Sequence, residues 1–564
     1  MGQRSTGRDR ARCALALAGA LAAHAIVALA QVPPDAGRIQ EQLRAPEPPK
    51  KPAAPQIRIE PPPGEAKADT APFFVRAFHV TGATVFPEQR LMALLGEPQR
   101  PMRLAEVQAL ADRITELYRQ HGYIVARALI PAQDVRDGIV EVRVVEGRYE
   151  RIDINNASDV SERRIRGLLG GVSEDALVHG PSLERVVLLI SDLAGIQARA
   201  TLEPGTQPGY TNLLLEIVPA RATEYDLSLD NGGSRFTGRY RLSAGATLNG
   251  PLKIGDRLSV RALTSGQNLS FVRLAYEAPV GVSGLRAIAY TSETDYQLGD
   301  QFTALDASGM ARNVGAVLAY PLMRSADRNF RVQLGAEARE LEDRIAAFQV
   351  NNKKNVGLLQ WGGAGDARDG FLGGGITGFQ ALLTHGRVYL HTPELAASDA
   401  TTTRTQGHFQ KFLLGANRLQ IITDKLRLGL NYTGQLASRN LDSSEKLSVG
   451  GITGVRAYPP GEAAGDDVHL LQAELRYAAG IWRNAQLSPL LFLDYARSRT
   501  NHQVWEGFSG RNVRSLYDAG VGAEWANPGI WFIRGWYAHK LSNEVATADR
   551  DRAFRLWFQV GMLF

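Results

Sequence analysis

The sequence predicts a membrane-spanning β-barrel of about 16 antiparallel strands, preceded by two small α+β modules. Three observations support this prediction. From residue 220 onward, apolar and polar residues alternate and no helical period persists. Residues 73–219 contain the same order of strands and helices twice. After residue 30, no apolar stretch approaches the roughly 18 residues that a spanning helix needs.

Composition narrows the possible functions. With 564 residues the chain is expected to hold more than one domain. Lys plus Arg number 64 against 58 for Asp plus Glu, and no basic run contains interleaved aromatics, so nucleic-acid binding is not expected. The histidines are scattered and form no ligand cluster, so neither a metal nor another cofactor is predicted.

The first 30 residues have the pattern of a secretory signal peptide. Four arginines precede an Ala-rich apolar stretch, and a small-residue site ends at Ala30, which predicts cleavage before Gln31. The alternative is an uncleaved anchor helix. Cys13 is the single cysteine, so the mature chain would have neither a disulfide framework nor a thiolate nucleophile. This composition suits export into an oxidising compartment.

Two short segments precede the modules. Residues 31–45 contain a helical pattern, PDAGRIQEQLR, in which Ile39 and Leu43 are four residues apart and share one face. Residues 46–72 are rich in proline. Such a segment buries too little apolar surface to offset the entropy of ordering, so it is predicted to be an extended or disordered linker.

Residues 73–148 and 149–219 are predicted to fold as two β-α-α-β-β modules. In the first, strands are expected over 74–86, 123–131 and 138–147 and helices over 88–96 and 104–122. The apolar face of the second helix is expected to comprise Leu104, Val107, Leu110, Ile114 and Leu117. Each sheet would have an exposed edge, to which an extended polypeptide can add as a further strand.

Residues 220–564 are predicted to form the barrel. In TGRYRLSAGATL, the apolar positions from Tyr240 to Leu248 alternate with polar ones, and the chain ends on the strand pattern RLWFQVGMLF. A large soluble β-sandwich or propeller is the alternative. The polar faces are rich in Arg, Gln and Glu, and a dry interior would leave those charges uncompensated. A barrel with a wet lumen avoids this cost.

The alternation is interrupted by a loop rich in Gly and Pro, predicted over 448–467, with the sequence SVGGITGVRAYPPGEAAGDD. A loop of about 20 residues is long enough to have a function of its own. We expect it to fold into the barrel, with Arg456 bound by an acidic residue on the wall. The alternative is a solvated loop arginine.

Several segments together resemble a known family. They are PDAGRIQEQLR, IPAQDVRDGIVEVRVVEG, LDNGGSRFTGRYR and LSVGGITGVRAYPPGEAAGDD. The chain resembles the two-partner secretion transporters of the bacterial outer membrane, the hemolysin and filamentous-hemagglutinin secretion and activation proteins. The resemblance implies a plug helix at residues 31–45, two periplasmic POTRA modules, and a channel that exports a large β-helical exoprotein without ATP.

The resemblance also implies partners. They are the exoprotein with its N-terminal secretion domain, outer-membrane lipid, and the barrel-assembly machinery that inserts the chain itself. An outer strand of the first module is expected to bind the exoprotein; ordinary sheet packing is the alternative. That strand comprises Tyr123, Ile124, Val125, Ala126, Arg127, Ala128 and Leu129.

Two family motifs map onto the barrel region. The loop-tip motif Val-Arg-Gly-Tyr corresponds to Val455, Arg456 and Tyr458, with alanine in place of the glycine. The wall motif Phe-x-Asp-x-Gly corresponds to Phe492 and Asp494, again with alanine for glycine. A guanidinium and a carboxylate can form two parallel hydrogen bonds, which would hold the loop in one position. The alternative for the aspartate is a hydrated acid of the lumen.

Other functions remain as alternatives. A factor that inserts other barrels into the outer membrane would share the barrel and the loop motif, but that class usually carries more POTRA modules and lacks the plug helix. A passive porin would not need the modules. An enzyme is not expected, because the sequence contains neither a G-x-S-x-G nor an H-E-x-x-H pattern.

Overall fold

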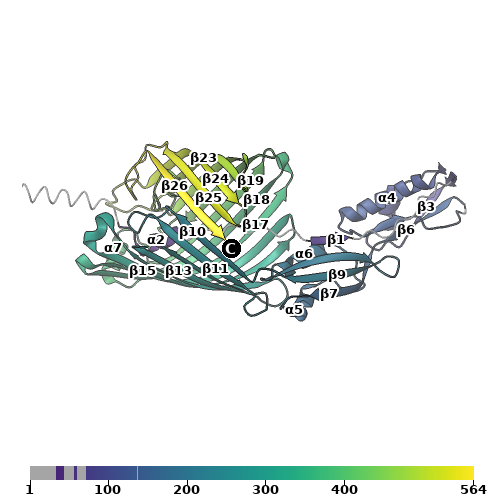
Figure 1. The fold of residues 1–564 in the computed structure, drawn as a ribbon, viewed down its shortest axis with the longest axis horizontal. Helices are drawn as coiled ribbons and strands as arrows, with labels where there is room; N and C mark the ends of the chain where they lie inside the picture. Colours follow the sequence, from purple (N-terminus) through teal and green to yellow (C-terminus); the bar gives the residue numbers. More distant parts are fainter. Residues whose placement is uncertain (1–32, 44–55, 60–70, 136) are drawn as a thin grey trace, which may run out of the picture.

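The computed structural model shows a barrel with two modules extending in a line from one end (Figure 1). It describes residues 33–43, 56–59, 71–135 and 137–564. The predicted signal peptide, its cleavage site at Ala30 and Gln31, and most of the linker lie outside the described residues. None of the described helices is long and apolar enough to cross a membrane.

The barrel is closed and antiparallel, with neighbouring strands in sequence order from β10 to β26. The short strand β22 continues β21, because both pair with β23 on the same side: Arg476 is opposite Leu490 and Gly480 is opposite Leu487. The 17 labelled segments therefore form a barrel of 16 strands, which confirms the predicted number. Closure comes from pairing of β26 with β10, which places Met562 opposite Leu227.

The barrel strands have these bounds: β10 (Thr223–Asp230), β11 (Arg241–Asn249), β12 (Arg257–Thr264), β13 (Leu269–Pro279), β14 (Arg286–Gln297), β15 (Ala307–Arg324), β16 (Arg328–Ile345), β17 (Val350–Asp369), β18 (Gly375–Leu390), β19 (Gly407–Ile421), β20 (Leu426–Ala437), β21 (Asp467–Tyr477), β22 (Gly480–Trp482), β23 (Ala485–Arg499), β24 (Val513–Asn527), β25 (Trp531–Lys540) and β26 (Phe554–Leu563).

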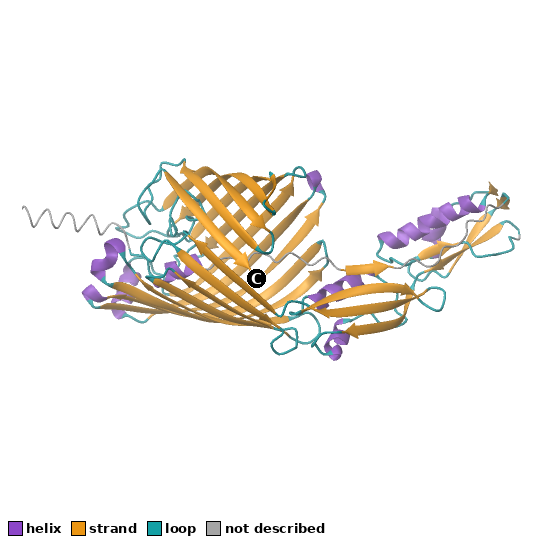
Figure 2. Ribbon diagram, viewed as in Figure 1, coloured by secondary structure: helices purple, strands orange, loops and turns teal. Residues whose placement is uncertain are grey.

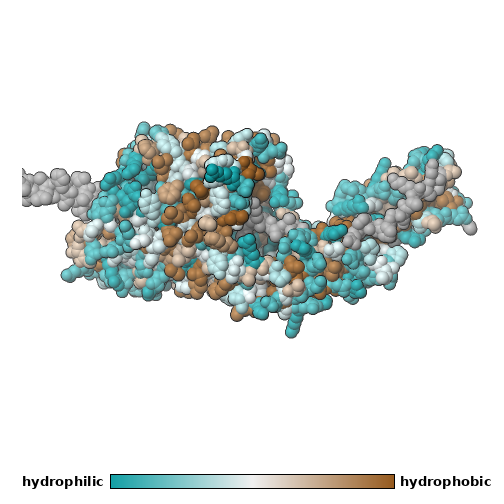
Figure 3. Space-filling view, viewed as in Figure 1, coloured by the Kyte–Doolittle hydropathy of each residue, from teal (hydrophilic) through white to brown (hydrophobic). Residues whose placement is uncertain are grey.

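Alternation along each strand separates two environments. On β23, Leu491 and Leu493 are 57% and 60% exposed, whereas Phe492 and Asp494 between and beside them are 3% and 2% exposed. The first pair faces outward and the second faces the lumen, as a period of two requires. Apolar residues gather on the outer wall of the barrel in Figure 3. This outward apolar surface matches what a lipid bilayer would cover.

The first module is a three-stranded sheet, in the order β3-β6-β5, covered by helices, with a two-stranded ribbon β2-β4 beside it. Its elements are β2 (Phe73–Val75), β3 (Ala77–Thr81), α3 (Glu88–Leu95), β4 (Arg100–Met102), α4 (Leu104–Gln120), β5 (Arg127–Leu129) and β6 (Ile139–Val145). The first strand ends at Thr81 rather than at residue 86, because the chain turns at Gly82, where φ is +78°.

The predicted face of α4 was partly wrong. The buried residues are Val107, Ala111, Ile114, Thr115 and Tyr118, whereas Leu104, Leu110 and Leu117 are only half-buried. The prediction weighted large aliphatic residues and so missed a small alanine, which allows close approach of the helix to the sheet. It also missed a tyrosine whose hydroxyl donates to Glu146 at 2.7 Å.

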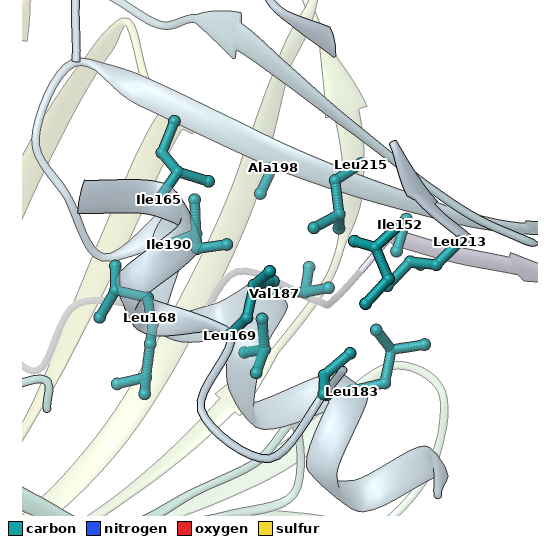
Figure 4. Close-up of a cluster of buried hydrophobic side chains, with 14 of the residues drawn as sticks. Ile152, Ile165, Leu168, Leu169, Leu183, Val187, Ile190, Ala198, Leu213 and Leu215 are labelled. Atoms are coloured by element: carbon teal, nitrogen blue, oxygen red, sulfur yellow. The ribbon is translucent and has the colours of Figure 1, made fainter. Parts of the chain in front are cut away.

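The second module repeats the plan with β7 (Arg148–Asn156), α5 (Glu162–Leu168), α6 (Gly180–Ser191), β8 (Ile196–Pro204) and β9 (Tyr210–Pro219). Its two helices pack on one face of the sheet, and Figure 4 shows Leu183 and Val187 of α6 directed toward Leu213 and Leu215 of β9. A fourth strand, β1 (Gln56–Ile59), comes from the linker and pairs in parallel with β8. The sheet order is therefore β1-β8-β9-β7.

The remaining helices lie at the ends of the barrel. Helix α2 (Ala36–Leu43) lies at the end remote from the modules, near α7 (Pro393–Thr401) (Figure 2). Helix α2 contacts β14, β15 and β16 and buries Ala36 and Ile39 against inward-facing side chains such as Leu341. Three short 3-10 turns lie between barrel strands: η1 (Asp300–Leu305), η2 (Ala346–Phe348) and η3 (Phe371–Gly373).

Candidate functional site: the loop and helix inside the barrel

The loop between β20 and β21 folds back into the lumen. It begins at Ser438, ten residues before the predicted start at 448, and its first part is already buried at Asn440 and Leu441. Leu447 and Gly465 pair as an isolated antiparallel bridge, which brings the two arms of the loop together. At Gly454 a Cβ would lie 2.1 Å from the carbonyl oxygen of Val449, so only glycine fits this close approach.

Arg456 occupies the tip of the loop and meets Asp494 on β23. Its Nε donates to Oδ2 at 2.8 Å and its Nη2 donates to Oδ1 at 2.9 Å, a two-bonded arrangement. Nη1 lies 3.2 Å from a carboxylate oxygen of Glu474, and the guanidinium carbon lies 3.6 Å from the ring centroid of Phe492. The side chains of Arg456 and Asp494 are 4% and 0% exposed. The structure therefore brings the two family motifs into one buried contact.

The neighbours of Arg456 are anchored as well. Val455 is fully buried and its amide donates to the carbonyl of Val449 at 2.7 Å. The hydroxyl of Tyr458 lies 2.5 Å from Ser542 Oγ and donates to the carbonyl of Glu544 at 2.8 Å. These contacts fix the loop tip to the segment between β25 and β26.

The alanines in place of the family glycines fit without backbone strain at the tip. Ala457 is absent from the non-glycine residues with positive φ, so its backbone lies in a region open to any L residue. Its amide donates to Asp518 of β24 at 2.5 Å. Ala496 is fully buried in the same apolar cluster as Val455 and Tyr458. Both methyl groups add packing to the contact between loop and wall.

The sequence did not single out Asp518 or Glu474 as partners of the loop. Asp518 lies directly opposite Asp494 in the pairing of β23 with β24, so three carboxylates surround one guanidinium. Among the described residues, Oδ1 of Asp518 has no hydrogen-bond partner. The alternation in VRSLYDAGVGAEW indicates that Asp518 faces the lumen. The sequence does not show which residue of β23 lies opposite it, because that depends on the register between the strands.

A second anchor holds the first arm of the loop. Glu445 accepts hydrogen bonds from Arg339 of β16, and its Oε2 lies 2.8 Å from Lys411 Nζ of β19. Beside it, Lys354 of β17 lies 3.0 Å from Asp442. All five side chains are no more than 10% exposed. The anchor joins the loop to the wall across from β23.

A third anchor holds the second arm. Glu462 is fully buried and lies 2.5 Å from Arg514 of β24. Its carboxylate also accepts the amide of Thr547 at 2.8 Å and that of Ala548 at 2.9 Å. The loop is thus tied to strands on several sides of the lumen, and each tie consists of buried charged groups with hydrogen-bond partners.

Helix α2 rests against both the wall and the loop. The amide of Ala36 donates to Asp343 at 2.7 Å, and the amide of Ser448 donates to Glu41 at 3.3 Å. A Cβ at Gly37 would lie 2.8 Å from the Cβ of Ser444, so glycine allows this close contact. Ile39 is 4% exposed and Leu43 packs partly buried against the same apolar cluster. Both predicted plug-helix residues therefore face the barrel wall.

Comparison with known proteins agrees with this architecture. The family model described as haemolysin secretion/activation protein ShlB/FhaC/HecB matches residues 209–516, more than half of the chain, and a model of the ShlB-type POTRA domain matches residues 73–147. The chain belongs to this family. It is an outer-membrane transporter of the two-partner secretion type rather than an enzyme, and its POTRA domain is periplasmic.

Individual relatives extend the match. The chain is 28% identical to the heme/hemopexin transporter protein HuxB of Haemophilus influenzae over 80% of both chains. It is 24% identical to the outer membrane transporter CdiB of Escherichia coli, over 75% of this chain and 72% of that one. The solved structure of CdiB from Escherichia coli superposes with a TM-score of 0.70 at 18% identity, covering 100% of both chains. This likeness shows a shared fold.

The predicted exoprotein-binding edge of the transporter is not one continuous strand. Only Arg127–Leu129 form β5, and the preceding prediction of a strand from Tyr123 is wrong. Ile124 and Val125 pack against the core of the second module, and the ring of Tyr123 contacts that of His179 in that module, with 5.3 Å between the ring centroids. Ala126 is fully buried. These residues are used to join the two modules, which a pattern within one module does not reveal.

The outer edge of β5 is also covered by helix α4. The amide of Ala128 donates to Thr115 Oγ1 at 2.9 Å, and its carbonyl accepts from Gln108 Nε2 at 3.1 Å, so a further strand could pair here only by displacing these bonds. In the second module the corresponding edge strand, β8, is paired with β1 from the linker. Both edges of the transporter that were expected to be open therefore already have partners.

One carboxylate stabilises the fold of the first module. Burial raises the pKa of Glu146, but hydrogen bonds from the Thr84 hydroxyl and amide, the Tyr118 hydroxyl and the Val85 amide outweigh burial and hold the pKa below its usual range.

Among the described residues, no group of three or more His, Cys, Asp or Glu side chains is arranged to hold a metal ion.

Proposed function

We propose that this transporter exports a large β-helical exoprotein of the hemolysin or adhesin type as an extended chain, without ATP, through the lumen that α2 and the loop now occupy. The carrying observation is that both segments lie inside the barrel wall, with Ile39 and Arg456 each only a few per cent exposed. A chain cannot share this space with α2. Export therefore requires α2 to leave, and folding of the exoprotein outside supplies the direction.

The second module is the proposed place of capture. Strand β1 is only four residues long and pairs in parallel with the nine-residue strand β8, from Gln56 opposite Arg199 to Ile59 opposite Leu202. An extended segment of the exoprotein's N-terminal secretion domain could replace β1 and use the same backbone donors and acceptors. Strand β5 has only three residues and its outer edge is covered by α4, so it offers fewer backbone groups for an added strand.

The pair of Arg456 and Asp494 is proposed to hold the loop tip on the wall while the exoprotein passes. The names of the relatives, a heme/hemopexin transporter and hemolysin transporters, favour an exoprotein of that general type. Other proposed partners are lipid of the outer membrane, which meets the exposed apolar face, and the barrel-assembly machinery that inserts the chain.

A crosslink between helix and loop tests the proposal. Because the Glu41 carboxylate reaches the amide of Ser448, a short thiol crosslinker with a cleavable spacer can join E41C to S448C. The doubly substituted chain is co-expressed with the exoprotein encoded beside it, and the exoprotein is measured in the medium by immunoblot. We expect crosslinking to stop export and reduction to restore it, with each single cysteine variant unaffected by the reagent.

Export that continues at the normal rate through the crosslinked chain would contradict the need for α2 to leave. Heat-modifiable migration of the barrel in electrophoresis shows that the variants are folded and inserted, so a loss of export can be assigned to the crosslink. Retention of the exoprotein by all variants, crosslinked or not, would instead point to a different exoprotein.

A further inference from the structure

Cations gather on the outward face of the barrel at its extracellular end. The outer cationic belt comprises Arg387 on β18, His408 on β19, His469 on β21, and Arg497 and Arg499 on β23, and all five are exposed. On β23 the alternate residues Ala496 and Ser498 are buried toward the lumen, so the two arginines face outward. The modules are periplasmic, so this end faces the outer leaflet.

Strand register places the cations of the belt side by side. Arg497 lies directly opposite His469, Arg499 lies opposite Asp467, and Arg387 lies directly opposite His408. Neighbouring strands are about 4.8 Å apart, and side chains directly opposite one another interact. Two basic side chains in such a position repel when both are charged, so each pair gains stability from an anion between them.

The arginines of these pairs are free to bind an anion. Neither Arg387 nor Arg497 forms a hydrogen bond or ion pair with the described residues. Asp467 lies nearby, but its carboxylate already accepts from the Ala437 amide and His502 Nδ1, both at 2.9 Å, and lies 3.3 Å from Arg499. The belt therefore keeps an uncompensated positive charge on the lipid side of the wall.

The height of the belt matches that of lipid headgroups. The next outward residue on β23 toward the middle of the wall is Tyr495, followed by Leu493 and Leu491, which are 60% and 57% exposed. Two residues along a strand span about 7 Å. Arg497 thus lies one step beyond an aromatic residue that borders the apolar band, which is the level of phosphate groups.

A pocket on this surface has mixed character. Its volume is about 660 Å³, and it is lined by His469, Arg497, Arg499 and His502 together with Asp467, Leu436, Ala437 and Val513. Cationic and apolar side chains in one concave site suit a ligand with an anionic head and a hydrocarbon tail.

Outward cations on the other side of the barrel differ. Arg312 of β15 pairs twice with Glu293 of β14, at 3.2 Å for each bond, and Arg344 of β16 lies 2.6 Å from Glu342. There the positive charges are already neutralised by neighbouring carboxylates. The excess of unpaired cations is thus a property of the sector from β18 to β23 and not of the whole rim.

We propose that the outer cationic belt binds the phosphate groups of lipid A, the phosphorylated glycolipid of the outer leaflet. Arginine guanidinium groups form paired, charge-assisted hydrogen bonds with phosphate. The imidazole N–H groups of the neighbouring histidines add hydrogen-bond donors. Acyl chains of the same lipid lie along the exposed leucines below the belt. The site fixes one sector of the barrel to the outer leaflet and is separate from the lumen.

Lipid binding to the full chain, refolded in detergent so that it carries no cellular lipid, tests this proposal. Native mass spectrometry counts bound bisphosphorylated lipid A and, in a parallel sample, lipid A with both phosphates removed. We expect the phosphorylated form to bind more tightly. Each of R497A and R387A is expected to weaken it about fivefold, since a cation near a lipid phosphate contributes about 1 kcal/mol, and tenfold corresponds to about 1.4 kcal/mol.

The matched control is R312A, which removes an outward arginine that already has a carboxylate partner, and it should leave lipid A binding unchanged. Heat-modifiable migration establishes that each variant is folded; R497Q and R387Q serve where an alanine variant is not. Equal binding of the two lipid forms, or no loss in the folded Arg497 and Arg387 variants, would overturn the proposal. Displacement of lipid A by millimolar inorganic phosphate would also overturn it, in favour of a free-phosphate site.

Discussion

Removing the Asp494 carboxylate is the most direct test of the contact between loop and barrel wall. In D494A the guanidinium of Arg456, 4% exposed, would lose both of its bonds to this carboxylate. Loss of one partner of a buried ion pair costs about 3–5 kcal/mol. Because Glu474 remains 3.2 Å away, we expect the lower value, about 3 kcal/mol. This lowers the ratio of docked to undocked loop by roughly 100-fold.

Two assays report this change. Ala457 is 1% exposed in the docked loop, so a cysteine placed there is labelled by a hydrophilic maleimide only when the tip leaves the wall. Labelling of A457C should accelerate by up to about 100-fold when D494A is added. Export of the exoprotein should fall in D494A and in R456A, while heat-modifiable migration shows that the barrel is still inserted.

Asp518 provides the matched control. It lies opposite Asp494 on the neighbouring strand and accepts the Ala457 amide, a bond that the side-chain oxygen of an asparagine retains. D518N should therefore keep the loop docked and export near normal. Normal export in both R456A and D494A, with unchanged labelling of the cysteine, would refute the idea that this pair holds the loop.

Three further outcomes are expected. A457G should leave export unchanged within about twofold, because the backbone there does not need positive φ; a large change would show a different docked backbone. I39D should release α2, since it places a charge at a position 4% exposed against apolar side chains, and should raise single-channel conductance in planar bilayers. The carboxylate of Glu146 has a pKa below its usual value of 4.5, so its stabilising effect is complete above that pH and is lost as pH falls through the lowered pKa. E146Q should therefore lower the melting temperature of the periplasmic modules at pH 7 and reduce its further fall between pH 5 and pH 3.

The barrel and its loop could be predicted because each has a local signal. Alternation along a strand depends on nearest neighbours in the sequence, so the facing of Asp494 and of Leu491 follows from parity alone. The match of two family motifs suggested which acid meets Arg456. Neither signal contains the register between strands, and register places Asp518 beside that pair.

Contacts between distant segments could not be predicted in this way. Arg339 and Glu445 are 106 positions apart, and their meeting depends on where the first arm of the loop enters the lumen. The misassigned strand from Tyr123 has the same origin. Its apolar residues satisfy the packing of a second module, whereas a pattern within one module treats them as an edge strand. Alternation shows which residues are buried, but not which surface buries them.

The ties of α2 indicate that it, rather than the loop, is the part that leaves. When α2 leaves, the charged wall residues that it contacts keep other partners. Asp343 still accepts from the Tyr296 hydroxyl at 2.6 Å, and Lys354 still lies 3.0 Å from Asp442. Removing the loop would instead expose or break three buried charged anchors, each worth several kcal/mol when one partner is lost.

The contacts of helix α2 with the barrel also leave buried polar atoms unpaired. Both side-chain amide atoms of Gln40 are buried without a hydrogen-bond partner among the described residues, and a buried polar group left in this way costs about 1–3 kcal/mol. A helix of eight residues is too short to be stable by itself in water, so α2 depends on its contacts with the barrel wall and the loop for its structure. An element that gains little from its site, and whose loss leaves the wall charges paired, can open the lumen while the loop stays docked.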